Sequence, residues 1–284
     1  MLRKIRQFIT TLTYHTAIAA SNEEEVALYV SPEQQEIIKF TFTPVDKTIK
    51  FGITAKYILV DWGDGSRRAY NNLNKTPIAH TYTNRAVRTV RILEAEAITN
   101  FNCTCQQLTA LDVSNCTTLI TLSCWGNLLG ALDVSKNTTL KSLVCSNNPL
   151  NTLDVSKNSA LLALSCRGNQ LRSLDISANT ALTELWCPNN PLNMLDVSKN
   201  RALTALDCSG GRLRRLDVST NPKLAGLSCY SNQLNALALD SIFTDLPNLL
   251  SKEKGEIIIG NNPGADACDR RIAIFKNWNV REYW

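Results

Sequence analysis

The sequence is poor in histidine and has no long apolar run, and each absence excludes a class of protein. Its 284 residues contain two histidines, His15 and His80, so neither a histidine-based catalytic triad nor a histidine zinc cluster can be assembled. No segment reaches the ~18 consecutive apolar residues that a membrane-spanning helix requires. No glycine-rich phosphate loop follows an expected strand. We therefore expect no catalytic residue, no cofactor and no bound metal.

Basic residues are also too sparse to indicate a nucleic-acid partner. The net charge is +5, and lysine and arginine never occur in runs longer than two. With 44% hydrophobic and 19% charged residues, the composition is that of a folded protein with a substantial core.

The N-terminal residues 1–33 are set apart as a leader. Residues 1–20 begin with basic residues, continue with a mildly apolar stretch and end in small residues before Ser21. This is the outline of a secretion signal. An ordinary N-terminal strand or helix is the alternative.

An internal repeat of 21 residues dominates the rest of the chain and predicts the architecture. Its pattern is L-D-V-S-x-N-x-x-L-x-x-L-x-C-x-x-N-x-L-x-x, and the second half resembles the signature of leucine-rich repeats. Stacking such coils turns the apolar stripe of each into one continuous core. Full copies start at Leu111, Leu132, Leu153, Leu174, Leu195 and Leu216.

Partial repeats extend the stack at both ends. A half-repeat begins near residue 97, and Ile257 to Pro263 matches a degenerate last coil. We expect a short helix over Asp240–Leu250 and a closing helix over Ala265–Trp278, because a terminal coil must cover its apolar face. The fold class is therefore mainly β, a solenoid of about seven coils with a parallel sheet. Repeats occupy residues 96–240, and the last coil and cap occupy residues 241–284.

Cysteine recurs once per coil at an inward position. A buried thiol behaves there as a small hydrophobe, and neighbours in register on parallel strands are poorly oriented for bridging. Core packing is the favoured interpretation, with a bridge among Cys103, Cys105 and Cys116 as the alternative. The recurrent cysteines are Cys103, Cys124, Cys145, Cys166, Cys187, Cys208 and Cys229.

Two polar residues recur with the same period. We expect the inward asparagines Asn127, Asn148, Asn169, Asn190 and Asn232 to bind backbone groups freed by the turn after each strand. The aspartates form a row of carboxylates that either caps turns through nearby serines or binds calcium, and capping is favoured. These aspartates are Asp112, Asp133, Asp154, Asp175, Asp196 and Asp217.

Residues 34–95 change to the period of a strand. Apolar residues alternate in Ile38–Phe42, Ile49–Ile53 and Ile58–Trp62, which predicts three strands separated by turns. The motif W-G-D-G-S at 62–66 and the later H-T-Y at 80–82 resemble polycystic-kidney-disease-type immunoglobulin-like sandwiches. We expect a small β-sandwich that caps the first coil, with the glycine-rich motif as a tight turn rather than a cation site.

The outward positions of the strands are mostly small, and six larger or charged side chains stand out against them. Exposed aromatic residues and arginine are enriched where partners dock. Trp125 and Trp186 lie three coils, or about 15 Å, apart along the sheet. Glu184 and Asp207 could in principle form a catalytic acid pair, but both are interpreted as exposed polar positions with ordinary pKa values. The expected ligand-binding residues on the concave face are Trp125, Arg167, Glu184, Trp186, Asp207 and Tyr230.

The combined motifs, L-D-V-S-x-N repeats behind a W-G-D-G-S sandwich, resemble those of bacterial cell-surface leucine-rich-repeat proteins. The resemblance implies a secreted or surface-located protein that binds a protein ligand in adhesion. A surface glycan-binding protein and a cytoplasmic scaffold or effector are the alternatives. The sequence leaves the ligand and the oligomeric state open.

Overall fold

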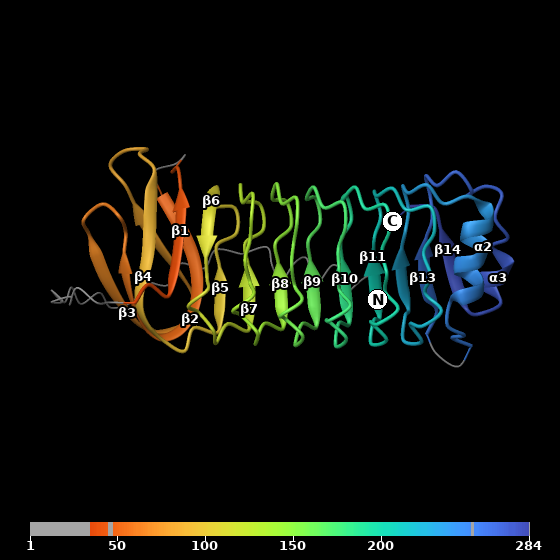
Figure 1. The fold of residues 1–284 in the computed structure, drawn as a ribbon, viewed down its shortest axis with the longest axis horizontal. Coiled ribbons are helices and arrows are strands. Elements are labelled where there is room, and N and C mark those ends of the chain that lie inside the picture. Colours follow the sequence, from red (N-terminus) through yellow and green to blue (C-terminus); the bar gives the residue numbers. More distant parts are fainter. Residues whose placement is uncertain (1–34, 45–47, 251–252, 284) are drawn as a thin grey trace.

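Short parallel strands, one from each coil, run side by side along the molecule (Figure 1). The computed structural model describes residues 35–44, 48–250 and 253–283, so the leader at 1–33 lies outside it. Within the described residues nine strands form the parallel sheet. They are β5 (Asn100–Asn102), β7 (Thr121–Ser123), β8 (Ser142–Val144), β9 (Ala163–Ser165), β10 (Glu184–Trp186), β11 (Ala205–Asp207), β12 (Gly226–Ser228), β13 (Gly255–Ile258) and β14 (Trp278–Arg281).

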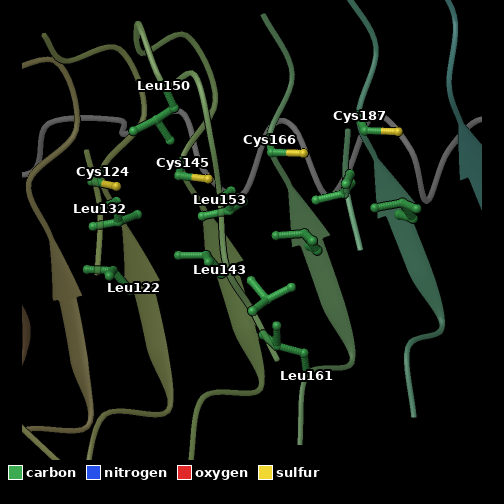
Figure 2. Close-up of a cluster of buried hydrophobic side chains, with 14 of the residues drawn as sticks. Leu122, Cys124, Leu132, Leu143, Cys145, Leu150, Leu153, Leu161, Cys166 and Cys187 are labelled. Atoms are coloured by element: carbon green, nitrogen blue, oxygen red, sulfur yellow. The ribbon is translucent and has the colours of Figure 1, made fainter. Parts of the chain in front are cut away.

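The core of the solenoid is a set of columns of identical side chains. Leu122 pairs in register with Leu143, and Leu143 with Leu164, so each buried leucine packs on its equivalent one coil away. The cysteines form a parallel column that points the same way (Figure 2). All ten cysteines are free thiols, and the seven recurrent ones are buried. Core packing is confirmed for this column.

Two columns of asparagine tie successive coils together. Asn148 donates through Nδ2 to the carbonyls of Cys124 and Cys145, and its Oδ1 accepts from the backbone of Leu129. This confirms the role expected for that column. A second column, which sequence analysis did not single out, lies on the opposite side of the coil. Its members are Asn137, Asn158, Asn179, Asn200 and Asn221, each donating to two carbonyls of the preceding coil.

The exposed aspartate row caps turns, as favoured from the sequence. Asp133 Oδ1 accepts from the backbone of Ser135 at 2.8 Å, and the equivalent bond recurs in every coil from Asp112 to Asp217. These bonds lower the pKa of the carboxyl in Asp133, Asp154 and Asp196, where a neighbouring lysine adds to the effect. Hydrogen bonding and lysine thus offset the repulsion along the row.

The turn after each strand has a non-glycine residue at one position in one coil and a glycine at that position in the next. The residue at this position has a positive φ in both cases, for example 51° at Asn147 and 63° at Gly168. A Cβ on Gly168 would lie 2.3 Å from Oδ1 of Asn147, and one on Gly210 would lie 2.2 Å from Oδ1 of Asn189. The side chain of Asn147 or Asn189 thus occupies the space that a Cβ would need in the next coil, so glycine must follow it there.

An antiparallel sheet closes the N-terminal end of the stack. Strand β2 pairs with β5 on one side of the first coil, and β1 pairs with β6 on the other. Phe40 and Phe51 contact Phe101 of β5, with ring centroids 5.9 and 5.6 Å apart. The two parts therefore share one core. The strands are β1 (Ile38–Phe42), β2 (Thr48–Asp61), β3 (Arg67–Thr81), β4 (Arg88–Glu96) and β6 (Leu108–Asp112).

One expectation for the N-terminal part is wrong. Ile49–Ile53 and Ile58–Val60 lie in one long strand, β2, because the residues between them form a bulge in the pairing with β3 and no turn. The polar stretch 67–81 forms the partner strand β3. It pairs only with β2, and such an edge position tolerates Pro77.

The C-terminal end also departs from expectation. Helix α2 spans Ala236–Asp245, begins with Asn235 as its N-cap, and buries Leu239, Ile242 and Phe243. The closing helix expected over Ala265–Trp278 is reduced to turns and α3 (Arg271–Ile274), since Asn277 has a φ of 67° and ends it. Strand β14 follows, so the estimate of about seven coils was too low. No helix among the described residues could cross a membrane.

We predict that the buried thiols are unreactive in the native protein. Burial raises the pKa of Cys145 and Cys229 to about 12, and the thiolate is the nucleophile. Ellman's reagent should label exposed Cys105 and, more slowly, half-buried Cys268, and the other eight cysteines only after denaturation. Replacing Cys105 with serine should remove the fast phase. Rapid native labelling of more than two thiols would contradict the structure.

We also predict that Gly168→Ala destabilises the solenoid by roughly 1–3 kcal/mol, because a side chain there has a positive φ and meets Asn147. Gly130→Ala is the control, since nothing lies within 4 Å of its Cβ position. The free energy of unfolding from urea titration measures both. Equal values for the two variants would refute the explanation of the alternating turns.

Candidate binding site on the sheet face

The outward side chains of the parallel strands form a surface that we call the sheet face. We number its rows along the strand direction: the first row holds the first residue of each three-residue strand, the second row holds the third residue, and the third row lies two residues further on. The second and third rows carry most of the larger residues. The second row contains Ser123, Val144, Ser165, Trp186, Asp207 and Ser228, which are neighbours in register. The third row lies just beyond the strand ends and contains Trp125, Ser146, Arg167, Pro188, Ser209 and Tyr230.

Large and small side chains alternate along these rows. In the third row Trp125 and Arg167 are exposed, whereas Ser146 between them and Pro188 beyond them are buried. Successive coils are only ~4.8 Å apart, so an indole or guanidinium needs a small neighbour on each side. Each large side chain therefore extends over its small neighbours. The sheet face has separate protrusions rather than a continuous layer of large side chains.

The aromatic residues expected to bind a ligand all lie on this face, with unequal exposure. Trp125 has 36% of its surface exposed. Trp186 and Tyr230 are half-buried, and Nε1 of Trp186 has no hydrogen-bond partner among the described residues. Trp125 lies three strands from Trp186, and Tyr230 belongs to the second coil beyond Trp186.

Asp207 is buried, contrary to the expectation of an exposed residue with an ordinary pKa. Only 8% of its surface is exposed. Burial raises the pKa of its carboxyl, while hydrogen bonds from Ser209 and the charge of Arg167 act in the opposite direction. The period of two correctly placed Asp207 on the outer side, but the neighbours in register, Trp186 and Ser228, leave it little contact with water.

The charged residues described near Asp207 form no ion pair with it. Arg167 is exposed, and its side chain forms no hydrogen bond or ion pair with a described residue, although it lies close enough to influence the Asp207 carboxyl. Glu184 is partly exposed at the start of β10. The structure thus brings Arg167, Glu184, Trp186, Asp207 and Tyr230 onto neighbouring coils and leaves Trp125 farther along the face.

The W-G-D-G-S motif in the N-terminal sheet is a turn whose carboxylates are already occupied. Asp61 accepts from the backbone of Gly63, and Asp64 accepts from Ser66 and lies 2.7 Å from Nε2 of His80. Although burial acts to raise it, the pKa of Asp64 is lowered to about 2 by the bonds with Ser66 and His80. The turn interpretation is confirmed. No group of three potential metal ligands occurs in residues 35–44, 48–250 and 253–283.

Comparison with known proteins supports the leucine-rich-repeat fold. No protein-family model and no curated protein matches the chain. The leucine-rich repeat domain of APL1B is 18% identical, with a TM-score of 0.50, over 63% of this chain and 60% of that domain. This likeness concerns the fold alone.

Two bacterial structures are also similar. The functional domain of InlJ from Listeria monocytogenes, which includes a cysteine ladder, is 29% identical with a TM-score of 0.45, covering 63% of this chain and 47% of that one. The Leptospira interrogans leucine-rich-repeat protein LIC12759 is 20% identical with a TM-score of 0.49, covering 59% and 50%. The chain thus matches about half the length of these two proteins.

We predict that Asp207→Asn stabilises the protein at pH 7. The raised pKa of Asp207 means that its ionised form destabilises the native state at pH values above that pKa. Asparagine keeps an oxygen for the Ser209 bonds and removes the charge. The midpoint of thermal unfolding should rise, and the gain should shrink as the pH falls through the raised pKa and wild-type Asp207 is protonated.

Asp217→Asn is the matched control for this prediction. Asp217 accepts the same pair of bonds from Ser219, but it is exposed and its pKa is lowered by them. Its ionised form therefore stabilises the native state, and the variant should melt at a lower temperature at pH 7. Changes of the same sign in both variants would show that Asp207 is not destabilised by burial.

Proposed function

We propose that this chain is a non-catalytic binding protein whose sheet face receives a protein partner. The observation that carries the proposal is the arrangement of that face, where aromatic and charged side chains gather among small neighbours. Trp, Tyr and Arg contribute disproportionately to protein interfaces. The proposed contact residues are Trp125, Arg167, Glu184, Trp186, Asp207 and Tyr230.

The state of the two acids favours binding over catalysis. Glu184 is partly exposed, whereas Asp207 is buried and accepts two hydrogen bonds from Ser209 on one oxygen. A hydrolytic pair needs both carboxyl groups to reach the same scissile bond of the substrate. The exposed guanidinium of Arg167, in the coil next to that of Trp186, is suited to an acidic or polar group of a docking protein.

We further propose that this binding serves adhesion at the bacterial cell surface. The support is the resemblance of the L-D-V-S-x-N repeats and the W-G-D-G-S motif to those of bacterial surface proteins. The surface location, the division at residues 95 and 96, and the polycystic-kidney-disease type of the N-terminal sheet stay predictions. A glycan ligand or a cytoplasmic scaffolding role is the competing outcome.

Paired glycan and host-protein arrays test the proposal. We expect the purified chain from Ser21 onward to bind protein spots, and the Trp125→Ala, Trp186→Ala double variant to lose at least about tenfold in affinity, since each aromatic contact removed at an interface costs about 1 kcal/mol or more.

The control for the arrays is Ile120→Ala, a substitution of an exposed apolar residue at the turn before β7. All variants should show the melting curve of a folded protein. Binding that survives in the double variant, or binding to glycans alone, would overturn the proposal.

A further inference from the structure

The coil that contains Asp207 breaks the alternation of the sheet face. In the two earlier coils with a glycine turn, the second row carries Ser123 or Ser165 and the third row carries Trp125 or Arg167. In the coil of Gly210 an aspartate takes the second-row place, and the third-row place is held by Ser209. Asp207 therefore places a carboxylate at the position where Ser123 and Ser165 have a hydroxyl. Because Ser209 is small, this coil also lacks the large third-row side chain that the two earlier coils have.

Only one oxygen of the Asp207 carboxylate accepts hydrogen bonds from the described residues. Both bonds from Ser209, at 3.0 Å from its backbone nitrogen and 2.6 Å from its hydroxyl, go to Oδ1. Oδ2 accepts no hydrogen bond of normal geometry from the described residues. The Ser228 hydroxyl lies near enough to lower the pKa of the carboxyl, yet its geometry is not that of a hydrogen bond.

The surroundings of Oδ2 combine unpaired polar groups with aromatic rings. Ser228 is 2% exposed, and neither its hydroxyl nor Nε1 of Trp186 has a partner in the described part of the chain. Both residues flank Asp207 in register, and Tyr230 belongs to the same coil as Ser228. Arg167 lies two coils away and forms no ion pair with Asp207, so this charge remains without a direct counterion.

We infer that Asp207 is the anchor for a lysine side chain of the protein that docks on the sheet face. The inference rests on the proposed function and adds the chemistry of one contact. A buried carboxylate is costly until a cation and its hydrogen bonds accompany it. One open oxygen suits the compact ammonium of lysine, whereas the fork of arginine needs both oxygens for a bidentate pair. The rings of Trp186 and Tyr230 favour a cation beside them.

Short peptides test the anchor on the full chain. The probe is acetyl-Gly-Gly-Lys-Gly-Gly-amide, followed in nitrogen-15 spectra through the indole N–H of Trp186 and the backbone N–H of Ser209. We expect saturable shifts in the millimolar range of peptide, weaker shifts with arginine at the central place, and none with norleucine, which has a similar length and no charge.

Two variants separate the anchor from general electrostatics. Asp207→Asn should weaken the lysine peptide at least about tenfold, the cost of a charged hydrogen bond. Asp217→Asn, which removes the same charge from an exposed turn of the same geometry, should leave the affinity unchanged. Equal binding by Asp207→Asn and wild type, equal binding of norleucine and lysine peptides, or shifts caused only by neutral sugars would each overturn the inference.

The same variants distinguish this failure from failure of the proposed function. If the Trp125→Ala, Trp186→Ala variant loses its array partner while Asp207→Asn keeps wild-type affinity for it, the sheet face is the binding surface and the lysine anchor is refuted. If neither changes partner binding, both proposals fail.

Discussion

The distance between successive coils constrains nearly every residue of the solenoid. Parallel strands lie ~4.8 Å apart, so each side chain has its own equivalent directly above and below it. A position can repeat one residue only if that residue packs on a copy of itself at this spacing. Leucine, cysteine and asparagine do so in the interior, while the large side chains of the sheet face and the asparagines of the turns need small neighbours.

The same spacing explains why the interior can hold columns of amide and thiol side chains. The amide of Asn148 fits between two coils because its nitrogen meets carbonyls of both. The thiol of Cys145 packs in the column of buried cysteines, and burial keeps it protonated. Asp207 differs from these groups, because its neighbours in register, Trp186 and Ser228, carry no charge to pair with it.

The repeat made the interior predictable from sequence, because a period of 21 identifies each residue with its neighbour in space. It predicted the columns of Leu122 and Cys124 and the caps at Asp133. The second asparagine column, headed by Asn137, carries the same signal and could have been found from it. Burial of Asp207 could not, since it depends on the size of Trp186 beside it, and periodicity contains no information on size. Beyond the repeat, the length of strand β2 depended on its pairing with β3 and β4, which no local pattern reveals.

The alternation of Asn147, Gly168, Asn189 and Gly210 has a consequence for how such a molecule changes length. Removing the coil of Gly168 alone would stack Asn189 on Asn147, with the amide oxygen of one in the place of the next Cβ, whereas removing the coil of Asn189 alone would stack Gly210 on Gly168 without such a clash. Removing two adjacent coils would restore asparagine beneath glycine at this turn. The turns therefore tolerate the loss of a pair of coils, or of one coil with an asparagine turn, but not the loss of a single coil with a glycine turn.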